Sequence, residues 1–390
     1  MIYLDNNATT PLAPEVLDAM LPYFTKHFGN PASKQHAFGW IAEEAVDHAR
    51  KQVADALGVE SHEIYLTSGA TEACNLALKG VYALYQRKGK HFVTVATEHK
   101  AVLDTCHYLE SLGAEITYLS VSAKGSLDLD QLKDSIRADT VLVSVMWANN
   151  ETGVIHPMEE IGKICAEKGT MLFSDATQAV GKIPVHPRET GIQLLALSAH
   201  KFHGPKGIGA IYISRKSPRV KVSPLIHGGG HENGVRSGTL NVPNIVGLGS
   251  AVSIAQNSMD ETRRRMEILR DDLEATLLKL SRAFVNGDTD HRLSHITNIR
   301  FDGIDGAALM SSLSKELAIA SGSACTSANP EPSHVLQAMG LTRDQAKASL
   351  RMSLGRYNSR EEILRATELI SNKVLGLRNI NIEWEMQRKD

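Results

Sequence analysis

Fourteen residues in the middle of the chain decide the fold: Leu194-Leu195-Ala196-Leu197-Ser198-Ala199-His200-Lys201-Phe202-His203-Gly204-Pro205-Lys206-Gly207. The apolar run at their start lacks two-residue alternation, which is typical of a strand that is covered on both faces. The polar and glycine-rich residues that follow predict a loop at the carboxyl end of this strand. That end is where open α/β sheets bind their ligands.

Six further apolar runs predict strands of the same kind: Glu63–Thr67, Phe92–Ala96, Ile116–Leu119, Val141–Trp147, Met171–Ser174 and Gly209–Ile213. Helical patterns lie between them, such as Val102–Leu112 and Met158–Lys168, and the second ends before Gly169, a natural C-terminal stop. This alternation of strand and helix favours an α/β fold with a mostly parallel, seven-stranded sheet covered by helices on both faces.

The last third of the chain has a different pattern. Ala251–Leu280 predicts one long helix, and we interpret its run Arg263-Arg264-Arg265 as a solvated face rather than a nucleic-acid patch. Separate strand and helix signals then predict a smaller α+β unit: Ile296–Phe301, Ala307–Leu317 and Glu361–Leu375. We therefore expect a large domain at residues 13–256 and a small domain formed by residues 1–12 and 257–390.

Composition narrows the class of protein. The 42 lysines and arginines against 44 aspartates and glutamates give a net charge of −2, which argues against nucleic acid or an anionic membrane as partner. No apolar run reaches eighteen residues and no secretory signal is visible at the N-terminus, so we expect a cytoplasmic protein that does not enter a membrane. Four cysteines are too few to cross-link 390 residues, and we expect thiols.

Two strand ends carry residues that suit a charged ligand. At Ser68-Gly69-Ala70-Thr71 a strand leads into a helix, and the partial positive charge of a helix N-terminus suits a phosphate. The alternative is plain capping of that helix by Ser68 or Thr71. Asp175 follows the run Met171–Ser174, so its carboxyl group is placed at the ligand-binding edge, or else caps the following turn.

Lys201 follows a buried strand directly and is a poor candidate for an ordinary surface lysine. A lysine with a lowered pKa attacks aldehydes and forms a Schiff base. The glycines after it precede a strand, so the dinucleotide-binding fingerprint fails, and His200 and His203 lack the partners of a zinc site. His99 also follows a strand and could stack on a ring. A lysine, an acid and a phosphate cradle are the three demands of pyridoxal 5′-phosphate.

The cysteines divide into two kinds. Cys325 stands among small polar residues, which predicts an exposed loop whose thiol can approach a bound ligand. Cys74, Cys106 and Cys165 lie in helical patterns and are expected to be small buried hydrophobic residues. Arg351 alternates with apolar residues, which predicts a strand that turns one arginine inward to grip a carboxylate; a surface ion pair is the alternative.

Taken together, the chain resembles the group I cysteine desulfurases of the IscS/NifS kind, within the class V aminotransferase-like, fold-type-I enzymes that use pyridoxal phosphate. The resemblance extends over nearly the whole chain, through Tyr3–Thr10, Gly29–Ser33 with His36, Ser68–Glu72, Thr97–Lys100, Asn149–Glu151, Asp175–Gln178, His200-Lys201, Gly228–Glu232, Arg236–Thr239, Ser321–Ser327 and Arg351. Two departures are Cys74, where we expect asparagine, and Trp147; neither is expected to touch a catalytic group.

The resemblance implies a role for each motif residue. Lys201 would hold the cofactor as a Schiff base, Asp175 would pair with the ring nitrogen, and His99 would stack on the ring. Gln178 would bond the phenolic oxygen. Further cofactor contacts would come from Ala70, Thr71, Asn150, Ser198 and His200, with Thr239 reaching in from the other subunit of a homodimer.

The implied reaction converts L-cysteine to L-alanine. Asn150 and Arg351 would hold the substrate carboxylate, and Cys325 would take the sulfur as a persulfide and pass it to an acceptor, an iron–sulfur scaffold protein or an enzyme of tRNA thiolation. In this family the C-terminal region helps to dock the scaffold. No resident metal is expected, though Cys325 could ligate a transferred iron–sulfur cluster. Alternatives are a selenocysteine lyase, a class V aminotransferase, which would not need Cys325, or a non-enzymatic sulfur carrier, which would leave Lys201 without a role.

Overall fold

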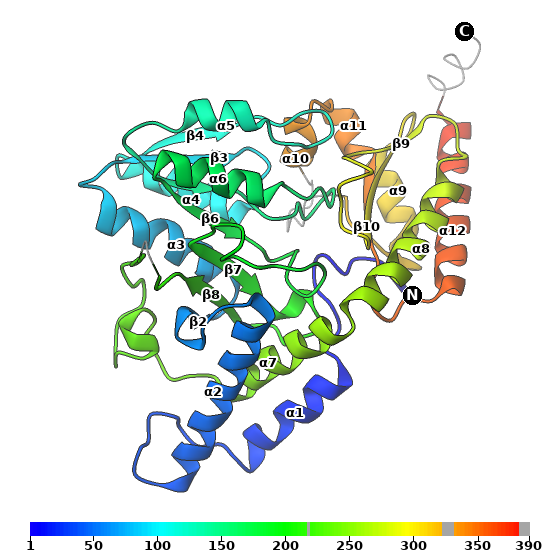
Figure 1. Ribbon diagram of the computed structural model, residues 1–390. Coiled ribbons are helices and arrows are strands. Elements are labelled where there is room, and N and C mark those ends of the chain that lie inside the picture. The colour runs from blue at the N-terminus through cyan, green and yellow to red at the C-terminus, as the bar shows by residue number, and fades with distance from the viewer. Residues whose placement is uncertain (217–218, 322–330, 382–390) are drawn as a thin grey trace.

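A computed structural model describes residues 1–216, 219–321 and 331–381, and its centre is a seven-stranded sheet with the order β2-β8-β7-β6-β5-β3-β4 (Figure 1). The strands are β2 (Ile64–Thr67), β3 (His91–Val95), β4 (Glu115–Leu119), β5 (Thr140–Ser144), β6 (Met171–Asp175), β7 (Leu194–Ser198) and β8 (Gly209–Ile213). Only β8 runs against its neighbours β2 and β7. The predicted seven-stranded, mostly parallel sheet is confirmed.

Helices cover both faces of this sheet. Along β7, Leu194 and Ala196 pack on one face, while Leu195 and Leu197 pack on the other, which explains why the strand is apolar throughout. The first face is covered by α3 (Ala70–Tyr85) and α4 (Lys100–Ser111), the second by α1 (Pro14–Thr25), α2 (Ala37–Leu57), α5 (Leu129–Ser135), α6 (Met158–Lys168) and α7 (Val242–Asn257). Helix α6 has the predicted bounds and ends at Gly169, whose φ is 67°.

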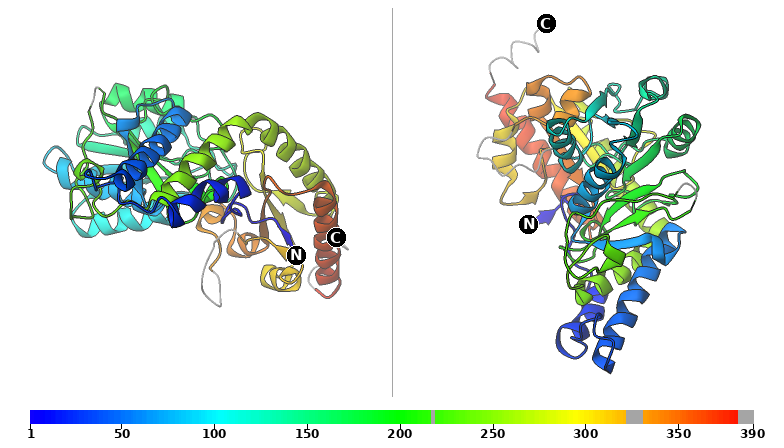
Figure 2. Two further views of the ribbon diagram at one scale, coloured as in Figure 1. Left: turned by 90° about the horizontal axis from the view of Figure 1, so that it is seen from below. Right: turned by 90° about the vertical axis from the view of Figure 1, so that its left-hand side faces the viewer.

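The predicted single helix over Ala251–Leu280 is wrong. The chain instead forms α7 and then α8 (Met259–Leu277), with Ser258 between them at φ −107° and ψ 9°. The Ser258 hydroxyl donates to the carbonyl oxygen of Ile254 at 2.8 Å, a back-bond of the kind that bends helices. Together α7 and α8 form the arch that joins the large sheet to the rest of the molecule (Figure 2).

A second core lies beyond this arch. It consists of the antiparallel sheet β12-β10-β9, in which β12 is Ser349–Ser353, β10 is Ile296–Phe301 and β9 is Ala283–Val285, packed against α8, α9 (Gly306–Leu313) and α12 (Arg360–Asn379). The expected α+β character is confirmed, although α9 is shorter than predicted because the chain enters β11 (Leu317–Ala318) and pairs with β1 (Ile2–Tyr3).

The remaining elements are short. They are α10 (His334–Ala338), α11 (Arg343–Lys347) and the 3-10 helices η1 (Ser61–Glu63), η2 (Ala199–Lys201) and η3 (Glu232–Gly234). In the described part of the chain, no helix combines the length and the apolar character that spanning a membrane requires. The domain boundary expected at residue 256 stays a prediction.

Candidate active site

The carboxyl ends of the parallel strands open into a cavity of about 720 Å³, called here the active-site cavity. A volume of this size is typical of small-molecule sites, which run from about 300 to 1,000 Å³. Ten of the predicted site residues line it: Ala70, Thr71, His99, Asn150, Asp175, Gln178, Ser198, His200, Lys201 and Arg351. Thr239 is exposed and does not line this cavity, and Cys325 lies outside the described residues.

Lys201 projects from η2, the short 3-10 helix that begins where β7 ends. Its Nζ donates to the carbonyl oxygens of Asn7 at 2.6 Å and Ala8 at 2.8 Å. Burial, and then the positive charge of Arg351, lower the pKa of Lys201 to about 8, against the opposing pull of Asp175 and Asp5. The lysine can therefore supply a free amine near neutral pH, which the attack on an aldehyde requires.

Asp175 ends β6 and is buried at the cavity wall. Its Oδ1 accepts the Thr177 backbone N–H at 3.0 Å, so the carboxyl group caps the following turn and faces the cavity at once; both interpretations from the sequence hold. Cys74 and Trp147, the two departures from the family pattern, lie closer to Asp175 than expected. The Cys74 thiol lies beside the Asp175 side chain, and Trp147 donates its backbone N–H to the Asp175 carbonyl oxygen at 3.0 Å. The expectation that neither residue touches a catalytic group was wrong for Cys74, whereas the bond of Trp147 joins backbone atoms only.

His99 caps the N-terminus of α4. Its Nδ1 accepts the Ala101 backbone N–H at 3.1 Å, so the neutral ring must carry its proton on Nε2. Burial lowers the pKa of His99, and the nearby Asp175 carboxylate opposes this only in part. A neutral imidazole on the cavity wall can stack on a planar ring and present one N–H to it.

The residues expected to hold a phosphate lie where β2 leads into α3. The N-cap of α3 is Gly69, and no side chain caps this helix, so the alternative of capping by Ser68 or Thr71 is wrong. The first N–H groups of α3 therefore remain free for an anion. Ser198 and His200 lie in the same cavity, and burial with the positive charge of Lys201 lowers the pKa of His200 to about 4, which leaves its ring neutral.

Arg351 and Asn150 form the group expected to hold a carboxylate. Arg351 lies in β12 and its side chain is 3% exposed, so the alternative of a surface ion pair is wrong. Its guanidinium pairs with Asp5 at 2.7 Å and donates to the Asn150 carbonyl oxygen at 3.2 Å. The Arg351 Nε and the Asn150 side-chain oxygen are buried without a partner among the described residues. Both atoms leave hydrogen-bonding capacity for a ligand.

Asn7 is a central residue that the sequence motifs did not single out. Its backbone oxygen accepts from Lys201 and, at 3.0 Å, from Gln178, and its side-chain Nδ2 donates to the Asn150 carbonyl oxygen at 3.0 Å. That bond fixes the amide orientation, so Asn7 Oδ1 accepts from Nε2 of the buried His295 at 2.7 Å. One residue thus positions the lysine, the glutamine and the asparagine of the cavity.

The described cysteines match their expected place in the core. Cys74, Cys106 and Cys165 are buried, and burial raises the pKa of all three thiols, to about 12 for Cys106 and Cys165. The described residues on either side of the segment that contains Cys325 lie near the active-site cavity. On one side Ala320 exchanges two backbone hydrogen bonds with Arg351, and on the other His334 lines the cavity and bonds the Glu98 carbonyl oxygen at 3.0 Å.

These groups fit pyridoxal phosphate. An amine with a lowered pKa, a buried carboxylate, an imidazole wall and an uncapped helix N-terminus meet in one cavity, together with two buried polar atoms that lack partners. Each matches one part of the cofactor: the aldehyde, the ring nitrogen, the ring face and the phosphate.

Comparison with known proteins agrees with this geometry. The family model for aminotransferase class-V matches residues 2–365. A cysteine desulfurase IscS from Rickettsia bellii is 49% identical over 389 residues, which are 100% of this chain and 94% of that protein. The solved structure of a NifS-like protein superimposes with a TM-score of 0.90 at 38% identity, covering 96% of this chain and all of that one. The structure of SspA in complex with cysteine superimposes with a TM-score of 0.81 at 36% identity, covering 92% of this chain and all of that one.

These relatives favour the desulfurase interpretation over a selenocysteine lyase, an aminotransferase or a non-enzymatic sulfur carrier. Identity of this level over the full chain, with the site residues gathered in one cavity, is enough to assign the protein to a family. The chain belongs to the class-V aminotransferase family and, within it, to the cysteine desulfurases, whose cofactor is pyridoxal phosphate.

Proposed function

We propose that this enzyme removes the sulfur atom of L-cysteine, leaves L-alanine, and stores the sulfur on Cys325 as a persulfide. The reaction balances without an oxidant. The C–S bond of the substrate and the S–H bond of Cys325 break, and one S–S bond forms at the Cys325 sulfur. The electron pair of the C–S bond stays on the substrate carbon, which takes up one proton to give the methyl group of alanine, so the proton count is unchanged. The single observation that carries the proposal is the meeting of Lys201, Asp175, His99 and Arg351 in one cavity.

When bound, pyridoxal phosphate supplies an electron sink for the substrate carbon. Asp175 would face its ring nitrogen and His99 its ring, while Gln178 would donate to its phenolic oxygen. Ala70, Thr71, Ser198 and His200 would hold its phosphate. Since the pKa of Lys201 is about 8, its Nζ can take up and release a proton near neutral pH.

Substrate orientation would depend on Arg351 and Asn150. The planar guanidinium is held from behind by Asp5 and by the Asn150 carbonyl oxygen, so its remaining N–H groups are aimed before substrate arrives. A carboxylate bound there would keep the rest of L-cysteine next to Lys201, because both residues line the same cavity.

Cys325 is the proposed sulfur acceptor. The three described cysteines are buried, and the raised pKa values of their thiols keep them protonated and unreactive. The fourth belongs to a segment whose described flanks are Ala320, which bonds the backbone of the cavity residue Arg351, and His334, which lines the cavity. The proposed onward acceptor is an iron–sulfur scaffold protein in the cytoplasm; the C-terminal residues 382–390, expected to help dock it, lie outside the described residues.

We further propose that the enzyme is a homodimer. Seven large apolar side chains of α1, the start of α2 and the loop between them are exposed: Leu17, Leu21, Phe24, Phe28, Phe38, Trp40 and Ile41. An apolar surface of this extent is typical of an interface between subunits. Thr239, exposed on the same chain, would then reach the phosphate cradle of the partner subunit.

The deciding experiment follows sulfur by mass. Purified yellow enzyme is incubated with L-cysteine, alkylated and digested, and the Cys325 peptide is weighed. We expect one added sulfur atom on Cys325 of the wild type and none after Cys325→Ser, which should still bind the cofactor. Alanine formation at the wild-type rate by Cys325→Ser, with ordinary thiols as acceptors, would contradict the assignment of Cys325.

A further inference from the structure

A second cavity lies behind Lys201, on the side away from the active-site cavity. We call it the rear cavity; its volume is about 70 Å³, enough for one small ion or a few water molecules. It forms at the break between α7 and α8, where Ser258, Met259 and Thr262 face the N-terminal segment and the residues after β12. Lys201 lines both cavities.

The rear cavity has cationic side chains and no acid. Lys182, Arg263 and Arg356 line it, whereas no aspartate or glutamate does among the described residues. His203 and His295 also line it, and burial lowers the pKa of both rings, so they add no positive charge near neutral pH. Arg263 is exposed and Arg356 half-buried, so the cavity reaches the surface beside them. Much of the remaining wall is apolar, which strengthens the interaction of any charge placed inside.

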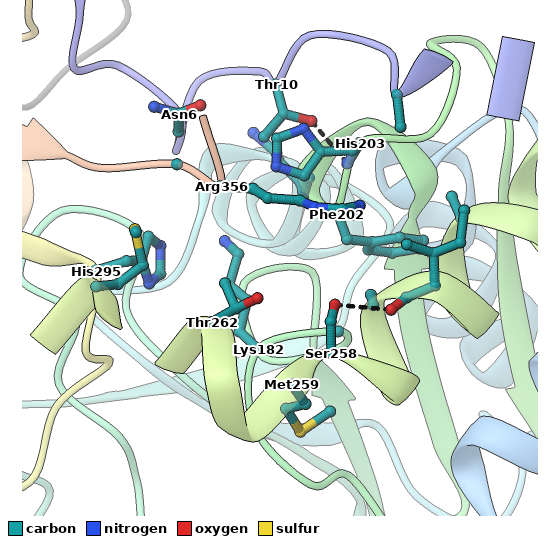
Figure 3. A pocket seen from close by; sticks show the side chains of 18 of the residues that line it. Asn6, Thr10, Lys182, Phe202, His203, Ser258, Met259, Thr262, His295 and Arg356 are labelled. Carbon is teal, nitrogen blue, oxygen red and sulfur yellow. Dashed lines mark hydrogen bonds between the residues drawn. The ribbon is translucent and has the colours of Figure 1, made fainter. Parts of the chain in front are cut away.

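Lys182 is the central group of this cavity. In Figure 3 its side chain rises into the open space between Thr262, His295 and Arg356. Its Nζ donates to Gln178 Oε1 at 2.6 Å, and no carboxylate of the described residues lies within ion-pair distance. Lys182 is half-buried, and an ammonium that is partly removed from water among other cations is stabilised by an anionic partner. Burial and the positive charges of Lys201 and Arg351 accordingly lower its pKa well below the usual range.

We propose that the rear cavity binds one small oxyanion, held by Lys182, with Thr262 and Arg356 as further donors. The chemistry shared by candidate ligands is a compact negative group with two or more acceptor oxygens, such as phosphate, sulfate or a short carboxylate. Arg356 and Arg263 have carboxylate partners outside the lining, Glu15 at 3.6 Å and Asp260 at 3.5 Å, so the anion would supply the counter-charge of Lys182. The planar guanidinium of Arg356 suits an oxyanion as a further donor.

The site is coupled to the active-site cavity. Lys182 bonds Gln178, whose Nε2 donates to the Asn7 backbone oxygen that also accepts from Lys201. A bound anion favours the protonated form of Lys182, so the amine takes up a proton from solvent when the anion binds. The resulting ammonium then holds the Gln178 side-chain oxygen in place. This consequence rests on the proposed function of Gln178 at the cofactor, and it predicts a small change in cofactor absorbance when the anion binds.

Calorimetry on the cofactor-loaded enzyme tests the site, because the bound cofactor occupies the residues expected to hold its phosphate. Heat that remains in Thr262→Leu, described below, is assigned to Arg351 and subtracted. Sodium phosphate, sulfate and acetate are titrated against chloride at equal ionic strength. We expect saturable heat with an oxyanion and none with chloride; a stronger response to acetate identifies a carboxylate ligand, and a stronger response to phosphate or sulfate an inorganic one. Absence of saturable binding with all three overturns the proposal.

Two variants localise the binding. Lys182→Met removes the ammonium and should weaken the oxyanion by about tenfold or more. Thr262→Leu fills the cavity without touching the active-site lining and should abolish binding, while Lys133→Met on the exposed face of α5 serves as the matched control. If Lys182→Met fails to load cofactor, Thr262→Leu decides alone. Wild-type affinity in Thr262→Leu overturns the proposal, whatever the fate of desulfurase activity.

Discussion

Lys201 and Lys182 lie at two adjacent cavities, the active-site cavity and the rear cavity, and show how neighbouring charges change the pKa of a lysine. Lys201 has Asp175 and Asp5 near enough to oppose the effect of burial, and its pKa is lowered to about 8. Lys182 has no such acid, and burial with two positive neighbours lowers its pKa well below the usual range. The difference between the two cavities is therefore the presence of carboxylates, which keeps one amine able to exchange protons near neutral pH.

The first prediction concerns the removal of the Lys201 amine. Lys201→Ala should lower the rate of alanine formation by more than about 10³-fold, because the chain loses both its Schiff-base amine and a proton carrier. The measurement is alanine release from L-cysteine, with cofactor absorbance recorded beside it. Lys133→Ala, on the exposed surface of α5, is the control and should keep wild-type activity. Substantial alanine formation by Lys201→Ala would show that the amine has been misassigned.

The second prediction concerns the guanidinium that lowers the pKa of Lys201. Arg351→Lys keeps the charge but loses the planar fork, so the KM for L-cysteine should rise roughly 10- to 100-fold, as expected for a lost charge-assisted bond. The rate at saturating substrate should fall less. Steady-state kinetics separate the two parameters. An unchanged KM would mean that the substrate carboxylate binds elsewhere and that Arg351 serves the structural ion pair with Asp5.

Local patterns in the sequence were enough to predict the active-site cavity. The apolar run before Lys201 predicts a doubly covered strand, and any parallel sheet gathers its strand ends at one edge. Asp175, His99 and Lys201 each follow such a run, so their meeting in one cavity could be expected. Helix α6 was equally predictable, because its pattern ends at Gly169, whose positive φ favours glycine.

The rear cavity was not predictable in this way. It depends on the break at Ser258, which arises from one hydroxyl bond inside an otherwise continuous helical pattern. It also brings together Asn6 and His295, which lie 289 positions apart in sequence. The burial of Cys74 was predicted, but its contact with Asp175 was not, because that contact is set by how α3 packs on the sheet rather than by the motif around Cys74. Such pairings leave no periodic signal.

The third prediction tests whether His295 acts through Asn7. His295→Leu leaves the Asn7 side-chain oxygen buried without a donor, and should lower kcat by about tenfold and stability by about 1–3 kcal/mol. His295→Gln places an N–H close to the same point and should recover most of kcat. Thermal unfolding and steady-state rates of both variants check this. Equal rates for the two variants would give His295 a packing role only.

The last prediction is the smallest effect, a shift in a pH profile. The rate at which cofactor-free protein takes up pyridoxal phosphate depends on the unprotonated fraction of Lys201, so it should rise about tenfold per pH unit below pH 8 and level off above it. An ordinary lysine would keep gaining rate up to its usual pKa near 10.5. In Arg351→Met the charge that lowers the pKa of Lys201 is gone and Asp5 is left unpaired, so the plateau should move to higher pH. Stopped-flow absorbance measures the profile. A plateau at the same pH in Arg351→Met would mean that burial alone lowers the pKa of Lys201.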